Sequence, residues 1–226
     1  MGTAIVTGAG SGIGAAAAKK LGAAGWNVAL VGRRPDPINQ VAAEIEKAGG
    51  RAVALSADLG EAAAAKDVVA RAIDAFGGID ALVNNAAVIK VLPLAEYTID
   101  ILDQHWAVNI RAPFLLIQAA LPALKKTSGS VVNISSSSGT ILRPGQSVYG
   151  MTKSALEYLT RSLAGELARH KIRINALALG PVDTPIHKTW ATDLAAAYVW
   201  LAGQVPLGRI ASADEIARWI EILVSP

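Results

Sequence analysis

Three polar residues between positions 136 and 153 have types and a spacing that suit proton transfer. Tyr149 and Lys153 lie four residues apart in a segment with a helical pattern, which places them one turn apart on the same helix face. An isolated phenol ionises near pH 10, and a nearby fixed cation favours the phenolate. Ser136 ends an apolar stretch and would donate to the same substrate oxygen. The spacing also occurs on solvated helices, but with Ser136 it predicts acid–base chemistry in which Lys153 lowers the pKa of Tyr149.

A glycine-rich segment near the N-terminus has the pattern of a nucleotide-binding turn. Residues 4–7 are apolar enough for a strand, and the glycines that follow them open a helical segment. Glycines permit a tight turn, let backbone amides approach a pyrophosphate and bring the positive end of a helix against it. A tight connection without a ligand would have the same composition. Its place between the first strand and the first helix favours nucleotide binding.

Short apolar segments alternate with longer helical patterns, which is typical of a parallel sheet covered on both faces. The predicted strands are 4–7, 27–31, 51–56, 81–83, 130–134 and 173–178. The predicted helices begin near Gly12, Pro37, Glu61, Thr98, Ala112 and Tyr149. The alanine-rich segments 15–18 and 62–65 are expected to be helical, because alanine is the best helix former. The elements therefore predict an α/β fold with a doubly wound parallel sheet.

The end of the second predicted strand bears on the choice of cofactor. At this place a carboxylate would bind a ribose 2′-OH, whereas an arginine meets a 2′-phosphate. The chain has Arg33 and Arg34 here, which favours NADP(H) over NAD(H). Arg33 is the expected contact, and Arg34 is either a second contact or a solvated cation. Two arginines that are only exposed cations of a loop would give the same sequence. Asp36 is expected to cap the next helix.

These segments together resemble the short-chain dehydrogenase/reductase family over essentially the whole chain. The glycine turn has the family's spacing, at Gly8, Gly12 and Gly14. The resemblance implies a Rossmann-type doubly wound parallel sheet in a three-layer α/β/α arrangement, as a single domain over residues 1–226. It also implies that Ser136 binds the carbonyl, that Tyr149 is the general acid/base and that Lys153 tunes it. No metal is implied.

The resemblance implies further site residues. Asp58 would face the adenine, although it could equally be the N-cap of the helix near Glu61. Asn84 would support the central sheet. Asn109 would anchor a water on a proton path from Lys153, or would be an ordinary helix cap or solvent-facing amide. The implied cofactor-binding set is Gly8, Ser11, Gly12, Ile13, Gly14, Arg33, Arg34, Asp58, Leu59, Asn85, Ala86, Tyr149, Lys153, Gly180, Val182 and Thr184.

The chain departs from the family pattern in three places. Ala87 stands where the turn after the fourth strand usually ends in glycine, so alanine must tolerate that conformation or cost about 1 kcal/mol. Leu179 stands where a proline is usual and Pro181 follows Gly180, which leaves the shape of that loop open. Most relatives continue beyond the position of Pro226 with a seventh strand. That strand is either lacking or lies outside the sequence given.

Residues 185–206 predict a helical lid with an apolar underside. Most of its large side chains are expected to pack on their own core, while the Trp190 end would be a mobile flap over the substrate. The substrate wall is expected to comprise Val88, Leu142, Arg143 and the Trp190 region. This wall suits a partly apolar carbonyl compound, with Arg143 as an anchor for an anion. After the lid, Ser212 and Glu215 predict a capping box that opens the last helix.

Composition restricts the partners. The net charge of +3 is spread over 21 basic and 18 acidic residues without a long basic run, so a nucleic-acid surface is not indicated. The longest apolar runs, such as 112–124, contain proline and glutamine and fall short of a membrane span. The absence of cysteine fits a reducing compartment, and the histidines His105, His170 and His187 are expected to be structural or exposed. A cytoplasmic enzyme with a small carbonyl or alcohol substrate is expected. The resemblance implies a homodimer or homotetramer through the helices near Ala112 and Tyr149. The rival hypothesis is a dinucleotide-binding regulator without turnover.

Overall fold

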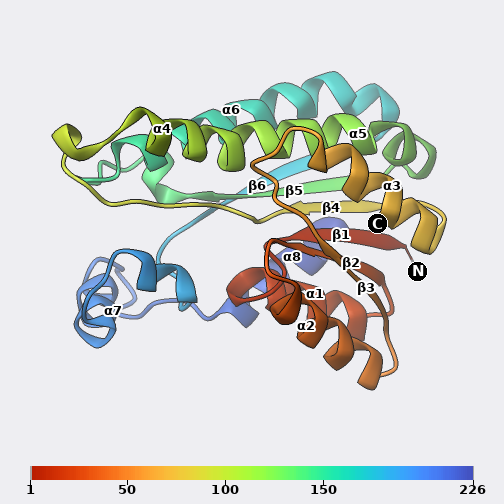
Figure 1. Ribbon diagram of the computed structural model, residues 1–226, viewed down its shortest axis with the longest axis horizontal. Helices are drawn as coiled ribbons and strands as arrows, with labels where there is room; N and C mark the ends of the chain where they lie inside the picture. The colour runs from red at the N-terminus through yellow and green to blue at the C-terminus, as the bar shows by residue number, and fades with distance from the viewer. Residues whose placement is uncertain (1, 226) are drawn as a thin grey trace.

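The computed structural model describes residues 2–225, which form a parallel sheet between two helical layers (Figure 1). The strands are β1 (Thr3–Thr7), β2 (Asn27–Gly32), β3 (Arg51–Ser56), β4 (Ala81–Asn84), β5 (Ser130–Ser136) and β6 (Arg173–Leu179). Their order across the sheet is β3-β2-β1-β4-β5-β6. The chain winds outward in one direction from β1 and in the other from β4. Ligands of such sheets bind where the order reverses, at the carboxyl ends of the strands.

The helices cover the two faces of the sheet and flank the carboxyl ends of its strands. They are α1 (Gly12–Ala23), α2 (Pro35–Lys47), α3 (Ala64–Phe76), α4 (Ile99–Trp106), α5 (Ala112–Thr127), α6 (Ser147–Leu167), α7 (Leu194–Gly203) and α8 (Ala213–Val224). In Figure 1, α1, α2 and α8 lie below the sheet and α3, α5 and α6 lie above it, while α7 stands apart at the lower left. The Rossmann-type, three-layer prediction is confirmed.

Side-chain alternation along the strands divides the core into two halves. Ala4 and Val6 of β1 pack in the cluster formed with α1, α2 and α8, whereas Ile5 between them packs in the cluster formed with α3 and α5. The alanines at 15–18 are buried against the sheet, so α1 approaches it closely. Both faces of each central strand are therefore apolar, which is why the strands appear in the sequence as continuous apolar runs.

Two local predictions are wrong, namely the start of the third helix and the cap by Asp36. The third helix begins at Ala64 rather than near Glu61, and Asp58 is not its N-cap, because the Asp58 Oδ1 atom accepts from the Gly60 N–H at 2.9 Å and closes a separate turn. Asp36 does not cap α2 either, since Pro35 is already the first residue of that helix. Of the two alternatives at Ala87, the first holds, because the backbone φ of Ala87 is not positive and alanine tolerates the conformation.

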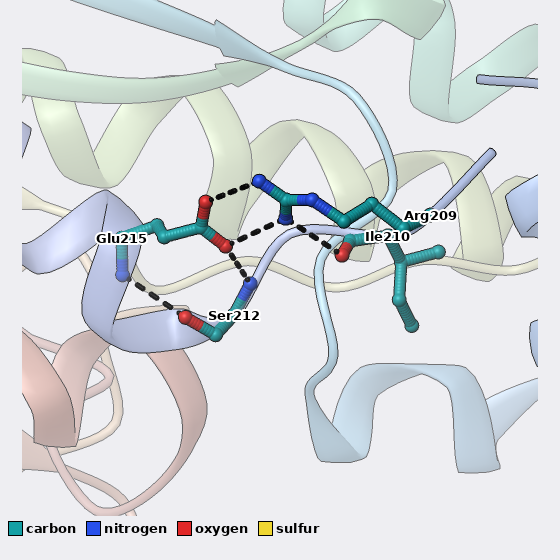
Figure 2. Close-up of polar contacts among 4 residues, drawn as sticks. All are labelled: Arg209, Ile210, Ser212 and Glu215. Atoms are coloured by element: carbon teal, nitrogen blue, oxygen red, sulfur yellow. Dashed lines mark hydrogen bonds and ion pairs between the residues drawn. The ribbon is translucent and has the colours of Figure 1, made fainter. Parts of the chain in front are cut away.

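The N-terminus of α8 has the predicted capping box (Figure 2). The Ser212 Oγ atom accepts from the Glu215 N–H at 3.2 Å, and the Glu215 carboxylate accepts from the Ser212 N–H at 2.8 Å. The Arg209 guanidinium donates to both carboxylate oxygens, at 2.8 and 2.9 Å. This pairing, together with the backbone N–H of Ser212, lowers the pKa of Glu215 to about 2. The box fixes the start of the helix that packs against α1.

The continuous helical run Ile99–Thr127 is long and apolar enough, judged by length and composition alone, to cross a membrane. In the fold, 39% of its most apolar window is buried, and Leu116 and Ile117 pack on the sheet. A core helix of a globular domain passes the same test. The run is therefore weak evidence for a membrane span.

Candidate active site

A cavity of about 690 Å³ opens where the strand order reverses. Its volume lies within the range of about 300–1,000 Å³ that is usual for small-molecule and cofactor sites. Sixteen of the predicted site residues line it, namely Gly8, Ser11, Gly12, Ile13, Arg33, Arg34, Asp58, Leu59, Asn85, Ala86, Ser136, Tyr149, Lys153, Gly180, Val182 and Thr184. Gly14 and Asn109 are not among the lining residues. The fold thus brings segments from both halves of the chain to one place.

The glycine turn between β1 and α1 forms a narrow cradle. Gly8 has a φ of +64°, a conformation that favours glycine, and a Cβ on Gly14 would lie 2.2 Å from the Gly8 carbonyl oxygen. Ser11, at the N-cap of α1, makes no side-chain cap hydrogen bond. The first backbone N–H groups of this helix are therefore free of side-chain caps within the described chain. Such a helix end suits a pyrophosphate, so the residues present fit a nicotinamide dinucleotide.

Thr7 links the glycine turn to the turn after β4, and sequence reasoning missed it. Its Oγ1 atom accepts from the N–H groups of Asn85 and Ala86, each at 2.9 Å, and donates to the Val83 carbonyl. The Asn85 Nδ2 atom donates back to the Thr7 carbonyl at 2.8 Å. The sequence signal was the threonine directly before the first glycine of the turn. These bonds hold two walls of the cavity in register.

Asn84 crosses from β4 to β5 in the buried centre of the sheet, and the geometry agrees with its predicted support of the sheet. Its Nδ2 atom donates to the Asn133 Oδ1 atom at 2.8 Å, and the Asn133 Nδ2 atom donates to the Thr160 Oγ1 atom on α6 at 2.9 Å. The chain of amides fixes α6 against β5. The spacing between Ser136 at the end of β5 and Tyr149 in α6 depends on that packing.

Tyr149 and Lys153 are nearly buried, with 8% and 2% of their surfaces exposed. The Lys153 Nζ atom donates to the Ile134 carbonyl at 2.8 Å and lies 5.6 Å from the centroid of the Tyr149 ring. Burial lowers the pKa of Lys153 to about 8, although the Glu157 carboxylate raises it. The predicted placement of the two residues on one face of a helix is observed.

The predicted direction of the Tyr149 pKa shift is wrong. Burial raises the pKa of Tyr149 to about 12, and a side-chain hydrogen bond with Ser136 lowers it by less than burial raises it. The Lys153 ammonium donates to the Ile134 carbonyl and lies beside the phenol ring, so it does not offset the loss of hydration. The phenol is therefore neutral at pH 7 and holds a proton that it can donate.

Asn109 lies behind the cavity in a π-helical turn, Ala107–Arg111, between α4 and α5. Only 1% of its surface is exposed. Its Oδ1 atom accepts from the Val88 N–H at 2.9 Å, and its Nδ2 atom donates to the Val88 carbonyl and the Thr152 Oγ1 atom, both at 3.0 Å. It is thus neither a helix cap nor solvent-facing. It joins the loop after β4 to α6 next to Lys153, and π turns often mark functional sites.

The 185–206 segment is fastened to the loop after β6. The His187 Nε2 atom donates to the Val182 carbonyl at 2.8 Å, and the His187 ring meets the rings of Trp190 and Tyr198 edge to face. The Tyr198 hydroxyl donates to the Asp183 Oδ1 atom at 2.5 Å. His187 is buried, so the prediction that it is structural agrees with its contacts. These bonds place the Trp190 ring at the edge of the cavity.

All but one of the residues predicted to form the substrate wall line the cavity. Val88, Arg143 and Trp190 line the cavity. Leu142 does not, because its side chain is 94% exposed. The loop after β5 turns the neighbouring Arg143 inward and leaves Leu142 facing solvent.

Comparison with known proteins places the chain in a family. The model of the short chain dehydrogenase family matches residues 2–195. A 2,5-dichloro-2,5-cyclohexadiene-1,4-diol dehydrogenase of Sphingobium indicum is 34% identical over 98% of this chain and 88% of its own length. A short chain dehydrogenase of Burkholderia cenocepacia, solved in complex with NADP, superposes with a TM-score of 0.91 at 34% identity, covering 99% of this chain and 90% of that one.

A 3-ketoacyl-(acyl-carrier-protein) reductase of Brucella melitensis, complexed with NADH, also superposes with a TM-score of 0.91, at 31% identity. The match covers 100% of this chain and 91% of that one. The relatives share the fold, and the glycine cradle of this chain fits the kind of cofactor that two of these structures contain. The chain therefore belongs to the short-chain dehydrogenase/reductase family, the NAD(P)-dependent oxidoreductases that act on CH–OH or C=O groups.

Proposed function

We propose that this protein interconverts a carbonyl and a secondary alcohol with NADP(H), and that Tyr149 is the general acid/base. One observation carries the proposal: Ser136, Tyr149 and Lys153 line the same cavity as the glycine turn and Arg33. A dinucleotide held by the turn and a substrate oxygen held by the two hydroxyls would share this space. A pure dinucleotide-binding regulator has no use for the half-buried Ser136 hydroxyl and the buried Tyr149 hydroxyl beside a buried lysine.

The chain offers a holder for each part of the cofactor. The start of α1 would hold the pyrophosphate, Asp58 and Leu59 the adenine, Asn85 and Ala86 a ribose, and Lys153 the nicotinamide ribose. Gly180, Val182 and Thr184 would hold the nicotinamide. When bound, this group supplies or accepts the hydride. We propose that the 185–206 segment serves as the lid of the substrate end.

Tyr149 donates a proton to the substrate oxygen during reduction and takes it back during oxidation. Its raised pKa keeps it protonated at neutral pH. The Ser136 Oγ atom accepts from the Ser138 N–H at 3.2 Å, and its own hydroxyl, which bonds the Tyr149 phenol, would donate to the substrate oxygen when substrate is bound. Positioned acid–base catalysis of this kind contributes a factor of about 10²–10⁴. We propose further that Asn109 anchors a water through which Lys153 exchanges protons with solvent.

Arg33 is the proposed origin of the preference for NADP(H). Arg33 and Arg34 line the cavity after β2, and the Ser56 hydroxyl donates to the Arg33 carbonyl and fixes its backbone. Arg33→Ala should weaken NADPH binding about 10- to 100-fold, the value of a hydrogen bond to a charged group, while NADH binding changes little. Fluorescence titration with both cofactors measures this, and Arg34→Ala tests the second arginine. Equal losses for NADPH and NADH would contradict the assignment.

A turnover assay distinguishes the proposed enzyme from a dinucleotide-binding regulator without catalytic activity. The purified protein with NADPH and a panel of carbonyl compounds should oxidise NADPH, and the matching secondary alcohols should reduce NADP⁺. Absorbance of the reduced nicotinamide follows both directions. Tight cofactor binding without turnover on any carbonyl or alcohol class would favour the non-catalytic regulator instead.

We also propose a cytoplasmic homodimer or homotetramer that takes a small carbonyl or alcohol substrate and uses no nucleic-acid or membrane partner. The cysteine-free composition and the scattered charges support this setting. Size-exclusion chromatography with light scattering gives the oligomeric state.

A further inference from the structure

Arg143 is a positively charged residue that lines the cavity but is not among the residues proposed to bind the cofactor. It lies in the loop between β5 and α6, so Ser136 and Tyr149 flank it in the chain. Arg33 and Arg34 have a proposed role toward the 2′-phosphate, and the Lys153 ammonium binds the Ile134 carbonyl. Arg143 lines the same cavity and has neither an ion pair nor a side-chain hydrogen bond with any residue of the described chain.

The turn that carries Arg143 is held in place on both sides. The Gly145 carbonyl accepts from the Leu92 N–H and from the Tyr97 hydroxyl, both at 2.9 Å. The Gln146 N–H donates to the Arg143 carbonyl at 3.1 Å, and the Gln146 Oε1 atom accepts from the Ser138 hydroxyl at 2.8 Å. A backbone fixed in this way loses little conformational entropy when a ligand binds. The turn is therefore preorganised as a recognition element.

The surroundings of the Arg143 side chain favour an anion. The residue is half-buried, and Val88, Ile89 and Trp190 are apolar lining residues of the same cavity. Asp58 is the sole acidic residue among the described lining, and its carboxylate binds the Gly60 N–H. A partly desolvated guanidinium without a carboxylate partner gains most from a ligand that supplies one, and its planar fork matches a carboxylate in two bonds.

We propose that the substrate is an oxo acid, or the corresponding hydroxy acid, whose carboxylate binds Arg143. The inference rests on the proposed function and names the substrate class of that same site. The reacting oxygen lies at Ser136 and Tyr149, and a short apolar spacer reaches along Val88 and Trp190 to the guanidinium. Arg143 is then a specificity-determining residue, and it takes no part in proton transfer.

The test compares acids with their own esters. Acetoacetate, 4-oxopentanoate and 5-oxohexanoate are reduced with NADPH beside the methyl ester of each. At the best chain length, kcat/KM for the acid should exceed that for the ester about 10- to 100-fold, mainly through KM, because one charged hydrogen-bonded pair is gained. In Arg143→Met, which keeps the length of the side chain, the ratio should fall to about 1 while ester reduction stays within about twofold. Arg161→Met, an exposed arginine on α6, should keep the parent ratio.

Calorimetric titration separates this inference from the proposed function. Each acid and ester is titrated into the protein saturated with NADP⁺, which requires no turnover. Tighter binding of the acid that is lost in Arg143→Met supports the carboxylate site even if reduction is absent. Equal binding of acid and ester, binding of neither, or a preference that survives in Arg143→Met overturns the inference. Reduction of esters as fast as acids would leave the oxidoreductase proposal standing while removing the oxo-acid assignment.

Discussion

Tyr149→Phe is expected to reduce kcat about 10²- to 10⁴-fold, because it removes the group that we propose donates the proton and leaves the rest of the site in place. The ring is buried and would fill the same volume, so the fold should not change. Steady-state rates in both directions, together with NADPH titration, give the result. The binding constant for NADPH should stay within a few-fold of the parent value.

Tyr158→Phe is the matched control for this change. Tyr158 lies on the same helix, but 68% of its surface is exposed and it does not line the cavity. Its loss should leave kcat unchanged. If Tyr149→Phe retained the parent rate, Tyr149 would have no part in the mechanism and the proposed function would lose its acid. If it failed to bind NADPH, the phenol would instead be part of the cofactor holder.

Gly14→Ala should impair both the fold and the binding of the cofactor. The added Cβ atom would lie 2.2 Å from the Gly8 carbonyl oxygen and 2.6 Å from the Asn85 Nδ2 atom, so α1 or the glycine turn must shift. Overpacking of this kind costs about 1–3 kcal/mol of unfolding free energy. A displaced turn should also lower kcat/KM about 10²-fold, the usual result of a displacement of about 1 Å in a catalytic site. Thermal unfolding measures the first effect, steady-state rates at varied NADPH measure the second, and NADPH titration measures the loss of cofactor binding.

Gly165→Ala provides the opposite case within the same chain. Gly165 is a helical glycine of α6, and a Cβ there would meet no atom within 4 Å. Alanine should therefore raise the free energy of unfolding by about 0.5–1 kcal/mol. Similar behaviour of the two variants would mean that the cradle between Gly8 and Gly14 is not tight, and the cofactor-binding argument would weaken.

The sheet could be predicted closely because its strands are buried on both faces. Apolar runs such as Val131 and Val132 end at glycine or polar residues, and the observed strands extend the predicted ones by at most two residues. The start of the third helix was misplaced, since the alanines near Ala62 carry no cap signal that distinguishes a turn from a helix. The start of α8 was found because Ser212 and Glu215 form a local motif.

The site was predictable where one short segment defines it, as in the glycine turn and in the spacing of Tyr149 and Lys153. It was not predictable where distant segments meet. The pKa of Tyr149 depends on burial, and the Lys153 ammonium turns to the carbonyl of Ile134, nineteen residues earlier. The exposure of Leu142 likewise follows from a loop path that no local pattern encodes.

The bonds from His187 and Tyr198 have a kinetic consequence. They fasten the 185–206 segment to Val182 and Asp183, in the loop proposed to hold the nicotinamide, and not to the sheet. If coenzyme binding displaces that loop, the 185–206 segment would therefore move with it over the substrate site. Coenzyme would then bind before the substrate and dissociate after the product. The substrate site would be covered only while coenzyme is bound.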